Sequence, residues 1–225
     1  MRAPVSVIIP TLNAADSLPL CLQALSQGLE AGLIRELILS DGGSQDATAD
    51  IADQAGATLV SGPASRGGQL RRGAERANGQ WLLFLHADTQ LSPDWPAAVS
   101  AHLATGQAGY FRLQFNDPSL AARIVAGWAN LRSWVFGLPY GDQALLIPRS
   151  LYDAVGGFCD QPLMEDVAMA RALKGRITAL DAVATTSAAK YRKSGWIIRG
   201  ARNLWTLARY FAGVTPERLA QSYRK

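Results

Sequence analysis

The chain contains little cysteine and no long apolar run. Its 225 residues include two cysteines, Cys21 and Cys159, and no Cys-X-X-Cys pair, which argues against a disulfide framework or a zinc site. No segment reaches the roughly 18 uninterrupted apolar residues of a membrane span, and the first residues lack the apolar core of a signal peptide. These absences predict a cytoplasmic protein, with peripheral attachment to the inner membrane face left open.

Acidic residues are the minority among the charged ones. The chain has 18 Asp and Glu against 22 Lys and Arg, which gives a formal net charge of +4. A basic protein suits an anionic partner such as a nucleotide, a nucleic acid or an acidic membrane surface. The arginines are spread over several segments without interleaved aromatic residues, so we expect no nucleic-acid partner.

Strand-like and helix-like segments alternate in the first half of the chain. Short apolar runs predict strands at residues 5–9, 36–40 and 57–61 and from residue 81. Helices are expected from about residue 16 and over residues 48–55 and 70–77, with Ser44 as the N-cap of the second. This alternation predicts an α/β fold with a mostly parallel central sheet flanked by helices.

The second half of the chain is less regular. Its strands are expected at residues 109–115, 144–147 and 177–184, and its helices at residues 119–136, 165–174 and 195–212. No repeat or flexible linker marks a boundary, and 48% hydrophobic content is enough for a real core. We therefore expect one domain over residues 1–225, with functional halves of about 1–108 and 109–225.

The run from Trp81 to Asp88 reads W-L-L-F-L-H-A-D and brings His86 and Asp88 to the point where an apolar strand stops. Side chains alternate along a strand, so we expect both side chains to point the same way, at the edge where open α/β sheets bind ligands. Asp88 alone suits Mg²⁺, whereas an added imidazole favours Mn²⁺, and either cation would hold a diphosphate. The alternative is a plain strand-end turn capped by Asp88.

Two further loops are expected at the same edge of the sheet. The first strand leads into Pro10-Thr11-Leu12-Asn13, and the second into Asp41-Gly42-Gly43-Ser44. The Asp41 carboxylate would accept a hydrogen bond from a nucleobase or a ribose hydroxyl, while the glycines allow close backbone approach. The alternative for Asp41 is an Asp-Gly turn held by its own side chain.

A basic stretch, Arg66-Gly67-Gly68-Gln69-Leu70-Arg71-Arg72, opens one of the predicted helices. Backbone N–H groups at a helix start and arginine guanidinium groups both favour phosphate. Arg66 is the first candidate for a ligand contact and Arg71 or Arg72 the next. A solvated basic helix face is the alternative reading for at least one of them.

Adjacent acids stand before another predicted helix, in Met164-Glu165-Asp166. Such acids often serve only as favourable partners of the helix dipole. The functional alternative is a general base, because the dipole keeps a carboxylate ionised and ready to take a proton from an attacking hydroxyl. Upstream, the polar run from Pro139 to Gln143 is expected either to line an acceptor pocket or to form a turn.

The last predicted helix is amphipathic. One face carries Ile197, Ala201, Leu204, Ala208 and Phe211, and arginines stand opposite. We expect this apolar face to pack on the sheet, and the alternative is insertion in a membrane interface. Tryptophans in the helix at residues 119–136 pose the same question.

Four motifs in this order, P-T-L-N, D-G-G-S-Q-D, H-A-D and G-G-F followed by M-E-D, resemble the family-2 glycosyltransferases of the GT-A fold. The resemblance runs from about Val5 to Lys174. The later run P-Y-G-D-Q-A and the ending G-V-T-P-E-R-L-A-Q-S-Y are similar to a subgroup of small, single-domain bacterial members, some of them known as arsenosugar- or selenium-associated glycosyltransferases.

This resemblance implies a metal-dependent, inverting transfer of a sugar from a nucleoside-diphosphate-sugar, with UDP expected, to an acceptor hydroxyl. Asp166 would be the base and Glu165 its second choice. Asp88 and His86 would bind Mn²⁺ or Mg²⁺, and a homodimer is an open expectation. The nucleotide would contact Pro10, Thr11, Asn13, Asp41, Arg66, Arg71 and Ala87.

The chain departs from this family's pattern in several places. His86 stands where the metal motif Asp-X-Asp has its first acid, and the Q-x-x-R-W loop is not recognisable. A catalytically weakened nucleotide-sugar-binding or membrane-docking protein on the same fold is therefore the alternative function. A dinucleotide oxidoreductase is disfavoured because no G-x-G-x-x-G follows the first strand of this chain. A sugar-1-phosphate nucleotidyltransferase is disfavoured because this chain has no Gly-rich basic loop after the same strand.

Overall fold

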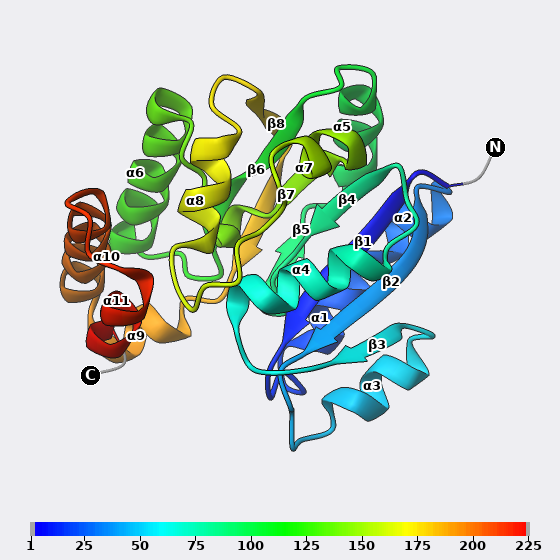
Figure 1. Ribbon diagram of the computed structural model, residues 1–225, viewed down its shortest axis with the longest axis horizontal. Coiled ribbons are helices and arrows are strands. Elements are labelled where there is room, and N and C mark those ends of the chain that lie inside the picture. The colour runs from blue at the N-terminus through cyan, green and yellow to red at the C-terminus, as the bar shows by residue number, and fades with distance from the viewer. Residues whose placement is uncertain (1–2, 224–225) are drawn as a thin grey trace.

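One mixed β-sheet runs through the part of the chain that the computed structural model describes, residues 3–223 (Figure 1). Its strand order is β3-β2-β1-β4-β7-β6-β8-β5. The strands are β1 (Val5–Thr11), β2 (Ile34–Asp41), β3 (Thr58–Ser61), β4 (Trp81–Phe84), β5 (Thr89–Leu91), β6 (Ala108–Phe115), β7 (Leu145–Pro148) and β8 (Ile177–Thr186).

The first four strands pair in parallel with one another, as their alternation with helices predicts. β7 then runs antiparallel to both β4 and β6. β6 and β8 are parallel, and the short β5 adds an antiparallel edge to β8. The predicted α/β fold is confirmed, with the parallel pairing concentrated in the first half of the chain.

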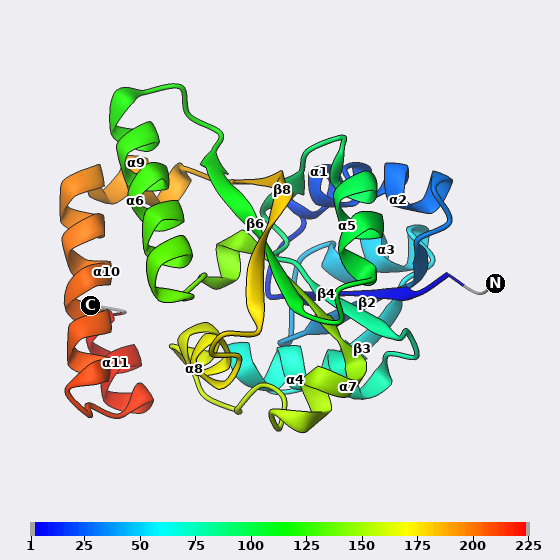
Figure 2. The ribbon, with the colours of Figure 1, turned by 90° about the horizontal axis from the view of Figure 1, so that it is seen from above.

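Helices cover both faces of the sheet (Figure 2). One face carries α1 (Leu18–Gln23), α2 (Ser26–Glu30), α3 (Thr48–Gln54) and α5 (Trp95–Leu103). The other carries α4 (Arg66–Arg76), α7 (Arg149–Ala154) and α8 (Glu165–Ala172). Side chains of β1 alternate between the two cores, because Val7 and Ile9 face the first layer and Ile8 the second. The sheet is therefore buried on both sides, as parallel sheets usually are.

The strand at Trp81 is fully buried but shorter than its apolar run suggests. β4 ends at Phe84, and the chain then turns, with the Thr89 amide donating to the His86 carbonyl at 3.1 Å. The expected alternation of His86 and Asp88 along a strand is therefore wrong. A turn, and not the strand pleat, presents these two side chains.

Several short elements were not expected from periodicity. They are α2, α5, α7, β5, the 3₁₀ turn η1 (Gly141–Gln143), α9 (Ala189–Ser194) and α11 (Pro216–Tyr223). The N-cap of α3 is Ala47, so the predicted capping role of Ser44 is wrong. The Ser44 hydroxyl instead donates to Asp41.

The C-terminal helices form a separate layer at one end of the molecule, with α6 (Leu120–Phe136) beside α10 (Trp196–Phe211) (Figures 1 and 2). The expectation that the apolar face of α10 packs on the sheet is wrong, because Ile197 is 87% exposed and Phe211 50%. The opposite, more polar face holds α10 in place instead, since Thr206 is buried and Leu207 packs beside the buried Leu219 of α11.

Within residues 3–223 both cysteines are free, Cys21 buried and Cys159 exposed. None of the helices in that range combines the length and apolar character that crossing a membrane requires.

Candidate active site

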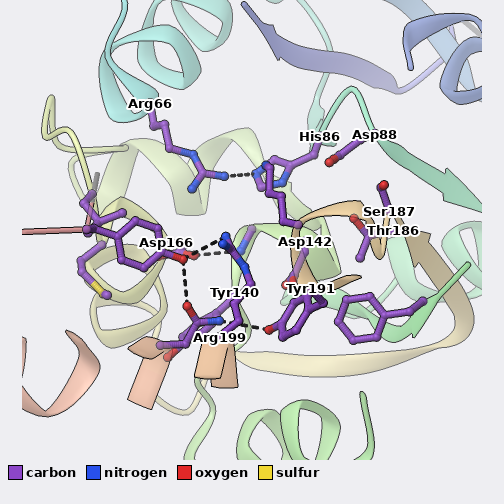
Figure 3. A pocket seen from close by; sticks show the side chains of 17 residues that line it. Arg66, His86, Asp88, Tyr140, Asp142, Asp166, Thr186, Ser187, Tyr191 and Arg199 are labelled. Carbon is purple, nitrogen blue, oxygen red and sulfur yellow. Dashed lines mark hydrogen bonds between the residues drawn. The ribbon is translucent and has the colours of Figure 1, made fainter. Parts of the chain in front are cut away.

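Two adjoining cavities lie beyond the carboxyl ends of β1 and β4. The larger, of about 580 Å³, is here named the edge cavity, and the smaller, of about 140 Å³, the polar cavity (Figure 3). The predicted nucleotide contacts that line the edge cavity are Pro10, Thr11, Asn13, Arg66 and Ala87. Both cavities are lined by Arg66, His86, Asp88, Leu163, Lys190 and Tyr223.

Asp41 lies beside the edge cavity and is buried in its own loop. Its Oδ1 accepts from the Thr11 and Ser44 hydroxyls, and its Oδ2 from the Gly43 and Ser44 amides at 2.8 and 2.7 Å. Burial opposes its charge, but these bonds outweigh burial and lower the pKa of the carboxyl. Its acceptor positions are already filled, so the geometry matches the turn alternative better than a direct ribose contact.

The loops after β1 and β2 are tied to each other. The Asn13 amide donates to the Ser44 hydroxyl, and the Gln45 amide donates back to Asn13 Oδ1 at 2.9 Å. Beneath them the buried Gln69 amide group donates to the carbonyls of Thr11 and Ser40 at 2.7 and 2.9 Å. Gln69 therefore fixes the spacing of the two strand ends, a role that its polar type alone did not indicate.

Arg66 stands at the centre of the site, at the first position of α4. Its guanidinium lies 3.3 Å from His86 Nε2 and 3.5 Å from the buried carboxylate of Glu165. Burial opposes the charge of Arg66, but four nearby carboxyls, led by Glu165, outweigh it and raise the pKa. Arg66 is therefore a fixed cation shared by both cavities, as its candidate role requires.

The backbone at the start of α4 does not face a ligand. The Gly67 amide donates to the Gln161 carbonyl at 3.2 Å, and the Gly68 amide to the Ser65 hydroxyl. A Cβ at Gly67 would meet the Cys159 carbonyl oxygen at 1.9 Å, so only glycine admits this packing. Of the groups predicted to bind an anion at this helix start, the Arg66 side chain is therefore the one that lines the cavities.

Arg71 and Arg72 lie away from the candidate site. Arg71 pairs with Glu75 one turn along the helix at 3.1 Å, and Arg72 donates to the carbonyls of Asp41 and Pro63. Neither lines the two cavities. The solvated-face alternative thus describes Arg71, and Arg72 supports the loop after β2.

His86 is held as a neutral imidazole. Burial, followed by the charges of Arg66 and Lys190, lowers its pKa well below the ordinary value. Because arginine can only donate, His86 Nε2 accepts the Arg66 contact. Gly141 packs against the ring so closely that a Cβ there would lie 2.6 Å from Nε2. This arrangement makes His86 a partner of Arg66, with Nε2 turned toward the guanidinium.

Asp88 remains as the carboxylate for a cation at the junction of the cavities. No group of three or more His, Cys, Asp or Glu side chains suited to a metal occurs among residues 3–223. A site built from one carboxylate still fits Mg²⁺ or Mn²⁺ when phosphate oxygens and waters complete the shell, because these ions commonly bind in that way. The donor set therefore suits a cation that arrives with a diphosphate.

The two acids at the start of α8 lie in different surroundings. Glu165 is 2% exposed, and burial followed by the charge of Asp166 raises its pKa to about 7, against the pull of Arg66. Asp166 lines the polar cavity, and its Oδ2 accepts from the Gly141 amide at 2.9 Å. Asp166 is thus the accessible base candidate, and Glu165 is a buried partner of Arg66.

A second polar cluster lies beside the polar cavity, which Tyr140 and Asp142 line. The Arg132 guanidinium stacks 3.4 Å from the centroid of the Tyr140 ring. Burial, opposed by Arg132 and reinforced by Asp166, raises the pKa of Asp142 to about 6. The sequence indicated the run from Pro139 to Gln143 as pocket lining or a turn. Tyr140, Gly141 and Asp142 line the polar cavity, and Gly141–Gln143 form a 3₁₀ turn. The sequence gave no sign of Arg132.

Three further cavity residues come from the C-terminal layer. The Arg199 guanidinium donates to the Tyr223 hydroxyl, which donates to Asn203 at 2.8 Å. Periodicity placed Arg199 on the helix face opposite the apolar residues and gave no sign of Tyr223. The packing of α11 against α10 and α8 brings Tyr223 to the polar cavity, which Arg199 and Asn203 also line.

The chain belongs to glycosyl transferase family 2, whose family model matches residues 6–156, more than half of the sequence. A PGL/p-HBAD biosynthesis glycosyltransferase of Mycobacterium bovis is 34% identical over 169 residues, covering 70% of this chain and 64% of its own length. Glycosyltransferase AglE of Haloferax volcanii is 26% identical over 174 residues, covering 72% of this chain and 54% of its own length. The chain thus spans about half to two thirds of these curated relatives.

Solved structures share the fold. Glucosyl-3-phosphoglycerate synthase of Mycobacterium tuberculosis, in complex with Mn²⁺, UDP-glucose and phosphoglyceric acid, superimposes with a TM-score of 0.60 at 21% identity, covering 82% of this chain and 70% of that one. S. aureus TarS gives a TM-score of 0.62 at 16% identity, covering 96% and 68%. These likenesses confirm the expected fold, and the family model and the 34% identical relative confirm the expected family. They do not address the arsenosugar- and selenium-associated subgroup, which stays a prediction.

Proposed function

We propose that this protein transfers a sugar from a nucleoside-diphosphate-sugar to an acceptor hydroxyl with inversion at the sugar C1. The observation that carries the proposal is the position of Asp166. Its carboxylate lines the polar cavity, while Arg66, His86 and Asp88 line both that cavity and the edge cavity. Donor and acceptor sites would then meet at one junction of fixed charges.

The edge cavity is the proposed donor site. Its volume of about 580 Å³ and its lining by the loop after β1, by Arg66 and by Lys190 suit a nucleotide with a charged diphosphate. Mycobacterial glucosyl-3-phosphoglycerate synthase binds UDP-glucose and TarS binds UDP-GlcNAc. We therefore propose UDP as the donor nucleotide. Second-half residues such as Tyr223 also line this cavity, so the donor and acceptor halves interlock.

Asp88 is the proposed ligand of Mn²⁺ or Mg²⁺, and the relative that binds Mn²⁺ supports a divalent cation. A bound cation supplies positive charge for the departing diphosphate. Arg66 and Lys190 supply further positive charge at the same junction. His86, being neutral and turned toward Arg66, positions that guanidinium.

The proposed reaction is a single in-line displacement. The acceptor oxygen forms a bond to C1 of the sugar as the bond from C1 to the diphosphate oxygen breaks. The electron pair leaves with the nucleoside diphosphate, and the acceptor proton passes to Asp166. The Gly141 amide, which donates to Asp166 Oδ2, holds the carboxylate in place. One base and one displacement give inversion.

Asp166→Asn tests the proposed base. Loss of a general base is expected to lower kcat by about 10²–10⁴-fold, because such groups contribute that much, while UDP affinity stays unchanged. Asp181→Asn is the matched control, since the Asp181 side chain is 94% exposed and pairs with Arg112 on the surface. Full turnover by Asp166→Asn would contradict the assignment. Absence of turnover in the wild type, with nucleotide-sugar affinity retained, would support the binding-protein alternative.

A thermal-shift series tests the donor and the cation. UDP-, GDP- and dTDP-sugars are each added with and without Mn²⁺. A ligand at 100 times its Kd stabilises the folded state by about 2.7 kcal/mol, or roughly 5–10 °C for a chain of this size. UDP-sugars with Mn²⁺ are expected to give the largest rise, and Asp88→Asn to remove the Mn²⁺-dependent part. Equal shifts with all three nucleotides would contradict a UDP site.

A further inference from the structure

An apolar groove opens between α6 and α10, away from the edge cavity. It encloses about 410 Å³ and is lined chiefly by Ile124, Val125, Trp128, Trp196, Ile197 and Leu204. Its walls include strongly exposed side chains, since Trp128 is 48% and Ile197 87% exposed. Exposed apolar surface of this kind commonly marks a binding site.

The groove adjoins the polar cavity. Tyr140, Asp142, Tyr191 and Asn203 line both spaces. Asp166, the proposed base, lines the polar cavity beside them. A ligand whose hydroxyl lies near the base would therefore have an apolar groove close by for the rest of its length.

Three buried polar atoms at this junction have no hydrogen-bond partner among residues 3–223. They are Arg132 Nη2, Tyr140 Oη and Asp142 Oδ1. Arg132 is only 7% exposed, although its guanidinium is charged. Buried polar groups normally have a partner, so such a cluster points to a missing one. A ligand hydroxyl or ether oxygen accepts from Arg132, and a hydroxyl donates to Asp142, which matches the cluster.

We propose that the acceptor is an amphiphile, with its hydroxyl end in the polar cavity and a single hydrocarbon chain in the groove between α6 and α10. This inference rests on the proposed function, since it names the acceptor class of the same site. The hydrocarbon chain would pack against the apolar side chains of the groove, and the hydroxyl end would meet the polar atoms of Arg132, Tyr140 and Asp142. A membrane surface or a second copy of the chain would cover the exposed rim but would leave the inner polar atoms without partners.

Gly200 allows the groove to be filled without touching the candidate active site. It lines the groove on α10, its φ is ordinary, and a Cβ there would meet nothing within 4 Å. Gly127 on α6 shares these properties but does not line the groove. Gly200→Leu and Gly127→Leu are therefore a matched pair. Both replace a helical glycine, which favours folding of each variant.

The probe is 11-bromo-1-undecanol, a hydroxyl-bearing chain whose bromine quenches nearby tryptophan fluorescence. Trp128 and Trp196 line the groove. Saturable quenching is expected in the wild type and in Gly127→Leu, and at least tenfold weaker binding in Gly200→Leu. Shorter bromoalcohols are expected to bind about three- to fourfold more weakly per methylene removed, because burial of one methylene contributes about 0.8 kcal/mol.

UDP-sugar thermal shifts on the same samples separate the two proposals. A normal UDP shift together with equal probe binding by Gly200→Leu and Gly127→Leu would overturn the amphiphile and leave the proposed function standing. No shift with any nucleotide-sugar, with probe binding intact, would overturn the proposed function. Vesicle binding or self-association that is lost in Gly200→Leu, without probe binding to the wild type, would assign the groove to a membrane or a second copy and overturn the inference.

Discussion

Glu165→Gln is expected to change how the stability of the protein depends on pH. The carboxyl is 2% exposed, and burial followed by the charge of Asp166 raises its pKa from the ordinary 4.5 to about 7. The folded state therefore holds the proton more tightly than the unfolded state does. The raised pKa of the Glu165 carboxyl therefore adds to the free energy of unfolding of the wild type. This contribution is fully present below pH 4.5 and is lost as the pH rises through about 7.

The magnitude follows from the size of the shift. Between pH 5 and pH 8 the wild type is expected to lose roughly 2–3 kcal/mol from this group, at 1.36 kcal/mol per pKa unit. Glutamine does not titrate, so the stability of Glu165→Gln relative to the wild type is expected to rise by that amount over the same range. Loss of the contact with Arg66 adds a constant offset and leaves the slope unchanged.

Urea unfolding at pH 5, 6, 7 and 8 measures this slope. Glu30→Gln is the matched control, because Glu30 is exposed at the end of α2, and its difference from the wild type is expected to stay flat. A flat difference for Glu165→Gln as well would refute the reasoning. It would mean that Arg66 compensates the burial of Glu165 fully.

Two further substitutions test the packing that builds the site. Gly141→Ala places a methyl group 2.6 Å from His86 Nε2 and is expected to displace the imidazole, which lowers kcat/KM by up to about 100-fold. Gly127→Ala is the control and is expected to keep full activity, because a Cβ at Gly127 meets nothing within 4 Å. Leu219→Ala removes a fully buried side chain beside Met164 and is expected to lower the opening free energy of α11 by about 2–5 kcal/mol, measured by amide hydrogen exchange. Unchanged protection of α11 would show that other contacts anchor that helix.

The sequence was most informative about the first half of the chain. Buried parallel strands need continuous apolar runs, and their carboxyl ends meet at one edge, so Thr11, Arg66 and Asp88 were correctly expected to lie near one another. The position of His86 was also found, although through a turn after β4 and not through strand alternation. Local patterns succeed there because neighbours in the sheet are close in the chain.

The second half depended on contacts that no local pattern contains. Arg132 is buried by stacking on Tyr140, and Tyr223 reaches the polar cavity through the packing of α11. Periodicity predicted α10 but assigned its apolar face to the sheet, because amphipathicity shows that a face is apolar and not what covers it.

The amino-acid order by itself thus determined the alternating strands and helices and the loops that carry charge to one edge, because hydrophobic spacing and glycine-rich turns act over a few residues. The tertiary structure alone decided which acid is accessible, which arginine is buried and which apolar helix face stays open. Those outcomes depend on long-range packing, where Leu219 of α11 meets Met164 before α8 and places Tyr223 over the site.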